Sequence, residues 1–99
     1  MIVITGTVRI PAGALDACRP AMKAMVEASN AEDGCLHYAY AEDVLEPGVI
    51  WVSEAWRDDA ALKGHADSAH MAAWRAAGAA LGLHDRNLTV YEAVSSRPL

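Results

Sequence analysis

A chain of 99 residues has room for one hydrophobic core and for no second domain. Although 54% of the residues are hydrophobic, no apolar run approaches the roughly 20 residues that a membrane-spanning helix requires, and so apolar a composition is not typical of a disordered chain. The formal charge of −5 at pH 7, without a stripe of basic residues, argues against nucleic acid as the main partner.

The first two predicted elements are a strand and a helix. Residues 1–10 have the alternation of a strand with apolar residues on both faces, and Pro11 and Gly13 end it. The next segment carries small and apolar residues at helical spacing: Leu15, Cys18, Met22, Met25, Val26 and Ser29. Pro20 is expected to bend this helix or delay its start, and Gly34 is expected to stop it.

A hairpin is predicted next. Residues 35–43 and 49–56 are rich in aromatic and β-branched residues, and the Glu-Pro-Gly sequence at 46–48 is typical of a turn. If Asp43 pairs near Val49, three pairs lie opposite each other on one face: Tyr38 with Glu54, Tyr40 with Val52 and Leu36 with Trp56. A slip by one residue would reverse the faces, so the register stays open at this point.

Two helices follow the hairpin. Asp58 is a favourable N-cap for a short helix over 60–65, and Asp67 or Ser68 can cap a longer one. Gly82 is expected to end that second helix. The short segment between the two helices makes the chain turn back within the region that carries most of its candidate functional residues.

The last strand is predicted over 88–94, with His84 in the loop before it. We expect residues 1–95 to form a single domain and 96–99 to be a short C-terminal tail. The order βαββαβ predicts an α+β, ferredoxin-like antiparallel sheet with its helices on one face. Because the strands carry apolar residues on both faces, the open face is expected to bind a second copy, giving a homodimer.

Cys18 and Cys35 are the only cysteines, and the first ten residues lack the charged segment and cleavage site of a secretory signal. We therefore expect a cytoplasmic protein with reduced thiols. Cys18 lies on the apolar side of the first predicted helix and Cys35 opens the second predicted strand. Both are expected to act as small buried apolar residues without a redox role.

The residue order over nearly the whole chain resembles that of the antibiotic biosynthesis monooxygenase family. The matching positions are Gly34-Cys35, Tyr38, Pro47, Glu54-Ala55-Trp56, Leu62, His65, Ser68 and His70. The resemblance implies the dimeric α+β barrel fold. It also implies oxidation of quinols or polyketide phenols with molecular oxygen, without metal, haem or flavin. Haem-degrading relatives have an asparagine where this chain has Gly6 and a histidine near Trp74, which argues against haem as the substrate.

The segment 54–74 is where we expect the chemistry. A quinol is flat and apolar, and its anion reacts with oxygen far more readily than the neutral form, so the reaction needs a base near neutral pH and donors for the oxyanion. His65 and His70 are the candidate bases, Tyr38 can donate to an oxyanion, and Glu54 can orient a histidine or bind a substrate hydroxyl. The candidate walls of the substrate slot are Trp51, Trp56, Trp74 and Tyr40.

These residues also have structural interpretations. The tryptophans are large enough to be core or interface residues, a histidine after a short helix often caps carbonyl groups, and His37 is expected to be packed or at the dimer interface. His65 and His70 lie five residues apart, not the three or four that place two ligands on one helical face, so the spacing predicts no metal site.

The sequence therefore predicts an enzyme, a cofactor-independent monooxygenase acting on a small quinol, phenolic or polyketide-like aromatic, with a histidine as general base. Two alternatives remain open. One is a dimer that binds a small aromatic molecule without turnover. The other is a cofactor-free isomerase of a small carbonyl compound, whose phosphorylated substrates would need converging cations from among Arg9, Arg57, Lys63 and Arg75.

Overall fold

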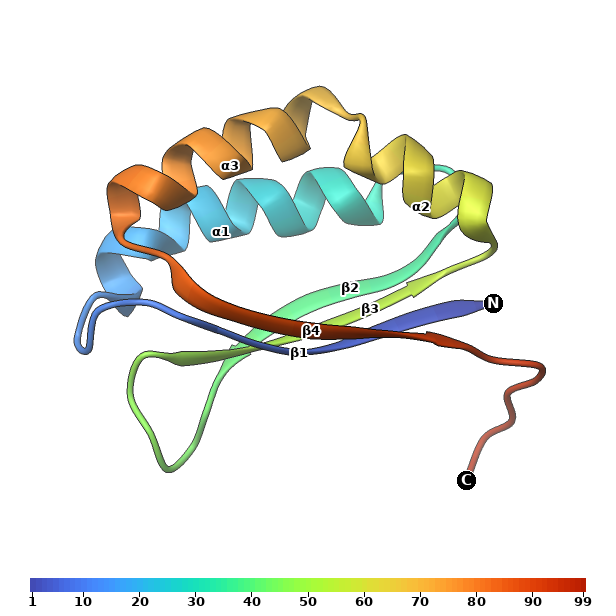
Figure 1. Cartoon of the computed structure of the whole chain (residues 1–99), viewed down its shortest axis with the longest axis horizontal. Helices are drawn as coiled ribbons and strands as arrows, with labels where there is room; N and C mark the ends of the chain where they lie inside the picture. Colours follow the sequence, from blue (N-terminus) through green and yellow to red (C-terminus); the bar gives the residue numbers. More distant parts are fainter.

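A four-stranded antiparallel sheet with all its helices on one face forms the fold (Figure 1). A computed structural model describes residues 1–99. The elements in chain order are β1 (Ile2–Arg9), α1 (Leu15–Asn30), β2 (Cys35–Glu42), β3 (Val49–Trp56), α2 (Asp59–Ala66), α3 (Ala69–Leu81) and β4 (His84–Glu92). The predicted βαββαβ order is confirmed, with the second helical connection broken into α2 and α3. None of these helices has the length and apolar character needed to cross a membrane.

The strand order in the sheet is β2-β3-β1-β4. The predicted hairpin register is confirmed for two of its three pairs, because Tyr38 pairs with Glu54 and Tyr40 lies opposite Val52. The register shifts between positions 35 and 37, so that Cys35, and not Leu36, lies opposite Trp56. This irregularity turns Leu36 outward and leaves it exposed, while the tyrosines after it keep facing the helices.

The core lies between the helices and the sheet. The helix-facing residues of β1 and β3 pack on the apolar side of α1, where Cys18, Met22 and Met25 are buried at helical spacing. Trp56 at the end of β3 is completely enclosed, with an exposed fraction of 0%. Cys18 fills a small apolar position, as expected, and both cysteines are free thiols.

The helix ends agree in part with the predicted caps. Asp58 accepts a hydrogen bond from the Ala61 amide, and Ser68 accepts one from the Met71 amide, so Ser68 is the N-cap of α3. Gly82 ends α3 in the left-handed conformation, as predicted. The expectation for Gly34 is wrong: α1 already ends at Asn30, and Gly34, with φ +83°, makes the turn into β2.

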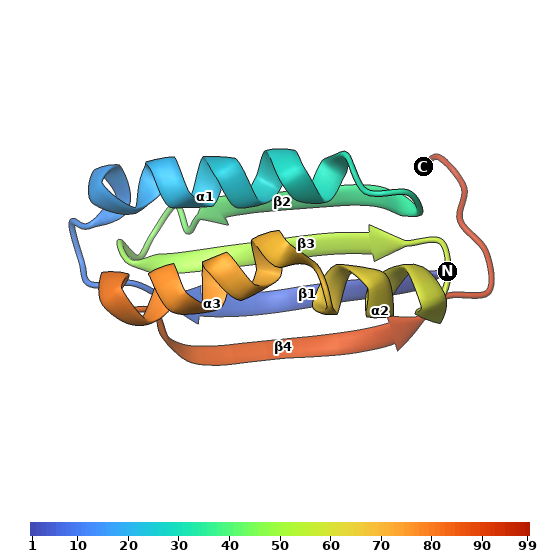
Figure 2. The same cartoon turned by 90° about the horizontal axis from the view of Figure 1, so that it is seen from above.

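The last strand begins at His84, four residues before the predicted start, and so includes the segment that was expected to be a loop. The residues His84 to Asn87 are polar and exposed, and the sequence there has no strand pattern. Backbone pairing with β1 extends β4 through this polar segment. Because β4 is an edge strand, pairing with this one neighbour is sufficient to hold it in the sheet. In Figure 2, α1 runs along β2 and the other two helices lie over the middle of the sheet, so β4 is the strand without helical cover.

The helix-free face is more polar than predicted. Trp51 and Tyr91 are exposed on it, at 47% and 53%. The middle of this face is formed by Thr5, which lies between Ser53 on β3 and Thr89 on β4. The expectation of an apolar open face therefore holds for its aromatic margins and not for its centre.

Candidate functional site

A cavity of about 790 Å³ lies between the two helices α2 and α3 and the helix-facing side of the sheet. Its volume falls in the range of small-molecule sites, and most of its lining is apolar. Five of the eight sequence-predicted site residues line it: Tyr38, Tyr40, Glu54, His65 and Trp74.

His65, on α2, lines this cavity and is almost completely buried. Its ring packs against Trp56 at a centroid distance of 4.5 Å and against Tyr38 at 5.3 Å, and only 4% of the residue is exposed. The break between α2 and α3 fixes the backbone at His65, since the Ser68 hydroxyl donates to the His65 carbonyl at 2.7 Å while capping α3. His65 is therefore held by packing against two aromatic rings and by a hydrogen bond on its backbone.

Glu32, in the turn between α1 and β2, contacts both helix histidines through one oxygen. Its Oε2 lies 2.6 Å from Nδ1 of His65 and 3.0 Å from Nε2 of His70. Since a carboxylate oxygen accepts hydrogen bonds, the two ring nitrogens that face it are the N–H donors. The neutral His65 ring then carries its lone pair on Nε2. That atom has no hydrogen-bond partner and is not among the fully enclosed polar atoms, and His65 is one of the residues that line the cavity.

The two tyrosines on β2 form a donor pair. Their hydroxyl oxygens lie 2.7 Å apart. Burial raises the pKa of Tyr38 and the pKa of Tyr40 far above the ordinary tyrosine range, against the opposing positive charge of Arg86. Both phenols therefore stay protonated at neutral pH. Because the pair has two protons and uses one between its oxygens, the other O–H is free to donate to a ligand.

Glu54 faces the same cavity from β3 but forms no hydrogen bond with either histidine. Its Oε1 accepts a hydrogen bond from the Trp56 indole N–H at 3.0 Å. Burial raises the pKa of this carboxyl, and the indole N–H lowers it by a smaller amount. The expectation that Glu54 orients a histidine is therefore not met, because Glu32 occupies that position.

Three predicted site residues lie outside the cavity lining. Trp56 packs beneath it, where it supports His65 and Glu54. His70 is half-buried beside Glu32. Trp51 points to the opposite face of the sheet, where its indole N–H donates to Asp43 at 2.8 Å, so in this chain it is not a wall of the cavity. The physical reason is the alternation of a strand: Val52 and Glu54 face the helices, so Trp51, one residue before Val52, faces the opposite side.

Sequence reasoning missed Glu32 and the cavity residues of the last strand. Glu32 lies in a turn, where no periodicity marks it, and its histidine partners are more than 30 residues away. Arg86 lines the cavity from β4, in the segment that was expected to be a loop. The only signal for Glu32 was its place just before the Gly34-Cys35 pair that contributes to the family resemblance.

Glu32, His65 and His70 also form a set of donors that can hold a metal ion, since their ligand atoms all lie within 4.8 Å of one another. The spacing argument against a metal site assumed one continuous helix. The break between Ala66 and Ala69 removes that assumption, because it reorients the second histidine toward the first.

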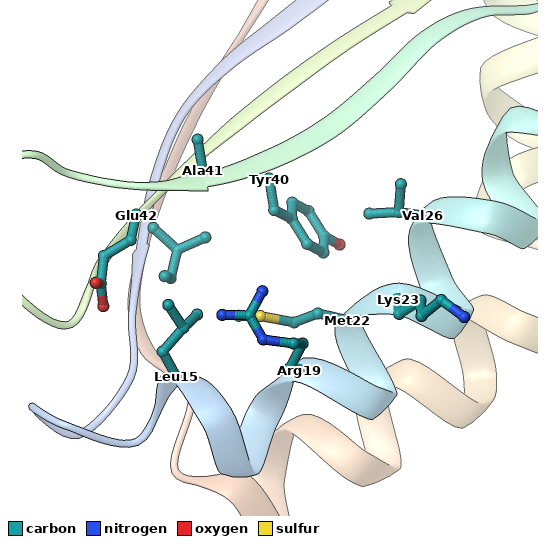
Figure 3. Close-up of a pocket in the computed structure, with 9 residues that line it drawn as sticks. Leu15, Arg19, Met22, Lys23, Val26, Tyr40, Ala41 and Glu42 are labelled. Carbon is teal, nitrogen blue, oxygen red and sulfur yellow. The ribbon is translucent and has the colours of Figure 1, made fainter.

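A second, smaller hollow of about 430 Å³ lies between α1 and β2 (Figure 3). Apolar residues form most of it, and Arg19, Lys23 and Glu42 are its charged members. Tyr40 lines this hollow as well as the larger cavity. It contains no histidine or other candidate base, so the candidate chemistry belongs to the larger cavity.

Comparison with known proteins gives consistent results. The sequence profile described as "Antibiotic biosynthesis monooxygenase" matches residues 1–77. YcnE of Bacillus subtilis strain 168, named as a candidate monooxygenase, is 30% identical over 78 residues, which are 79% of this chain and 82% of that protein. A candidate antibiotic biosynthesis monooxygenase from Deinococcus radiodurans has a structure with a TM-score of 0.90 and 27% identity, covering 100% of this chain and 98% of that one. Rv0793 from Mycobacterium tuberculosis gives a TM-score of 0.82 at 27% identity, covering 99% and 100%.

Proposed function

Because the chain belongs to the antibiotic biosynthesis monooxygenase family, we propose that it oxidises a small quinol, phenolic or polyketide-like aromatic with molecular oxygen and without a bound cofactor. The observation that carries the proposal is the buried His65, which lines an apolar cavity and whose Nδ1 is held by Glu32 at 2.6 Å, while its Nε2 has no hydrogen-bond partner. A base with one nitrogen fixed by a carboxylate and the other free is the arrangement that general-base catalysis uses.

The proposed reaction begins with proton transfer from a substrate hydroxyl or activated C–H to Nε2 of His65. The free O–H of the tyrosine pair donates to the resulting oxyanion, and the positive charge of Arg86 lies on the same cavity. The electron-rich anion then reduces oxygen. One oxygen atom enters the substrate and the other leaves as water, and the substrate supplies both electron pairs, so no external reductant is required.

The cavity walls support a flat apolar substrate. Trp74 stacks on Tyr40 at a centroid distance of 5.7 Å and an interplanar angle of 27°, and both line the cavity. Such stacked rings provide a planar apolar surface of the kind that aromatic ligands contact.

The direct test is oxygen consumption by purified protein with a panel of quinols and anthrones in an oxygen electrode. We expect uptake with at least one class and, with ¹⁸O₂, one labelled oxygen atom in the product. A flat trace across the panel, together with saturable binding of the same compounds, would replace the enzyme proposal with the non-catalytic binding alternative.

The isomerase alternative receives little support from the cations it would need. Arg9 pairs with Glu46, and Lys63 pairs with Asp67, both on the surface. Arg57 pairs with Asp33 and Asp58, and of the four cations named for that alternative only Arg75 lines the cavity.

We also propose a homodimer in which two helix-free sheet faces contact each other. The support is the exposed aromatic margin of this face and the placement of every helix on the other side (Figure 1).

Thr5→Arg places a charge at the centre of the proposed interface and is expected to convert the dimer to a monomer in light scattering. Ala24→Arg, on the exposed side of α1, is the matched control and should stay dimeric. A parent protein that is monomeric at micromolar concentration would contradict the proposal.

A further inference from the structure

We propose that Glu32, His65 and His70 bind a divalent first-row transition-metal ion, with Zn²⁺ preferred over Mg²⁺ and Ca²⁺, and that the bound ion switches off the proposed base. The switching part rests on the proposed function, whereas the binding part does not. The site combines two imidazoles with one carboxylate, a donor set that suits zinc, iron, cobalt and nickel much better than the hard cations magnesium and calcium.

The spacing of the donors fits a metal after a small rearrangement of the three side chains. Tetrahedral zinc with bonds of about 2.0–2.2 Å has ligand atoms about 3.3 Å apart. Oε2 of Glu32 lies 2.6 Å from His65 Nδ1 and 3.0 Å from His70 Nε2. The carboxylate therefore has to withdraw by less than about 1 Å. The two ring nitrogens lie within 4.8 Å of each other, so they have to approach by at most about 1.5 Å for an ion to take the place of the two N–H groups. Three protein donors leave the fourth position of zinc for a water molecule.

The ligands are held in position before any ion arrives. The His65 ring packs against both Trp56 and Tyr38, and Ser68 ties the end of α2 to the start of α3 through two hydrogen bonds. The break between these helices is thus fixed, and with it the relative orientation of the two histidines, whose ring centroids lie 5.8 Å apart. Rotamers locked by packing reduce the ordering cost of binding.

Metal coordination through Nδ1 changes what the other nitrogen of His65 can do. In the free protein Nδ1 carries the proton and Nε2 carries the lone pair. When the metal takes the lone pair of Nδ1, the proton moves to Nε2, and the neutral ring has no site left to accept a proton from a substrate. Binding at this site and general-base action by His65 therefore exclude each other.

The test uses the full chain, first stripped of metal with a chelator, and titrated with Co²⁺ as a spectroscopic probe. We expect visible d–d absorption typical of low-coordinate cobalt that saturates at one ion per chain and is abolished by Zn²⁺ but not by Mg²⁺. His70→Ala and Glu32→Gln should each weaken Co²⁺ binding at least about tenfold, because each removes one of three ligands. His84→Ala is the matched control, since His84 lies near Asp85 on the surface and should leave binding unchanged.

Absence of the cobalt absorption, or a spectrum that persists unchanged in both His70→Ala and Glu32→Gln, would overturn the site. For the switching part, Zn²⁺ should inhibit oxygen uptake by the parent protein at the concentration that displaces Co²⁺, and chelator should restore it. Uptake that rises on metal addition would overturn the inhibitory role. A protein that turns over no compound of the panel would refute the proposed function, while the cobalt titration would still decide the site.

Discussion

Replacing His65 with alanine is expected to lower kcat by about 10²–10⁴-fold, the range that general-base catalysis contributes. The reason is the geometry of the cavity, where Nε2 of His65 is the accessible ring nitrogen and Glu32 fixes the other one. Stopped-flow or electrode kinetics on the active quinol would measure the loss. His70→Ala should lower kcat by less than about tenfold, because Glu32 still holds His65 in that variant.

The enclosed position of His65 makes a second variant necessary. His65→Gln keeps a donor for Glu32 and much of the volume, so its fold can be compared with that of the parent by circular dichroism. If both folded His65 variants kept kcat within about threefold of the parent, far below the general-base range, a histidine base would have to be abandoned. Tyr38 or Glu54 would then become the candidate base.

Trp56→Ala is expected to cost about 3–5 kcal/mol in the free energy of unfolding, the usual cost of truncating a fully buried large aromatic residue. Trp56 has no exposed surface, and its removal also leaves Glu54 without the indole donor. Urea denaturation at a fixed protein concentration measures the change. Trp51→Ala makes the same change on the same strand at a position that is 47% exposed in the single chain. Because Trp51 lies in the proposed dimer interface, this control is measured in the monomeric Thr5→Arg background, where it should cost less than about 1 kcal/mol.

Trp56→Phe keeps an aromatic ring in the core but removes the indole N–H that donates to Glu54. Its cost in the free energy of unfolding should therefore depend on pH. Burial raises the pKa of Glu54 in the folded protein, and the indole N–H opposes that rise. A carboxyl whose pKa is higher in the folded than in the unfolded protein makes its full contribution to the free energy of unfolding at a pH below its unfolded-state pKa. That contribution is lost as the pH rises through its folded-state pKa. Loss of the N–H raises the folded-state pKa further, so Trp56→Phe should be more destabilising at about pH 8 than at about pH 4, on either side of the ordinary glutamate range. A cost independent of pH would contradict this account of Glu54.

The parts of the structure that follow from local rules could be predicted. Strand alternation, the Asp58 cap and the Gly82 stop depend on neighbours in the chain, and the hairpin register follows from its turn. The site could be predicted only where its residues lie on such elements. Tyr38, Glu54 and His65 came together because the register and the helix break bring them to one cavity.

The missed features depend on contacts between distant segments. Glu32 acquires its role from two histidines that lie more than 30 residues later in the chain, and nothing in its neighbourhood in the sequence distinguishes it from a solvated turn residue. Trp51 was grouped with the other tryptophans by composition, whereas a strand assigns alternate residues to opposite faces. The early start of β4 comes from pairing with β1, which overrides a sequence with weak strand propensity.

The position of β1 in the middle of the sheet has a consequence for the route by which this protein folds. The β2–β3 hairpin joins residues close in sequence, but Ile2 pairs with both Trp56 and Glu92, so β1 must wait for two much later segments. Such non-local pairings slow folding, because the entropy of closing a long loop is lost before the contacts form. β4 pairs with one strand only, so we expect it to join the sheet last. Since β4 carries Arg86 and Leu88 into the cavity, the cavity wall on that strand is then completed after the parts that hold the histidines and tyrosines.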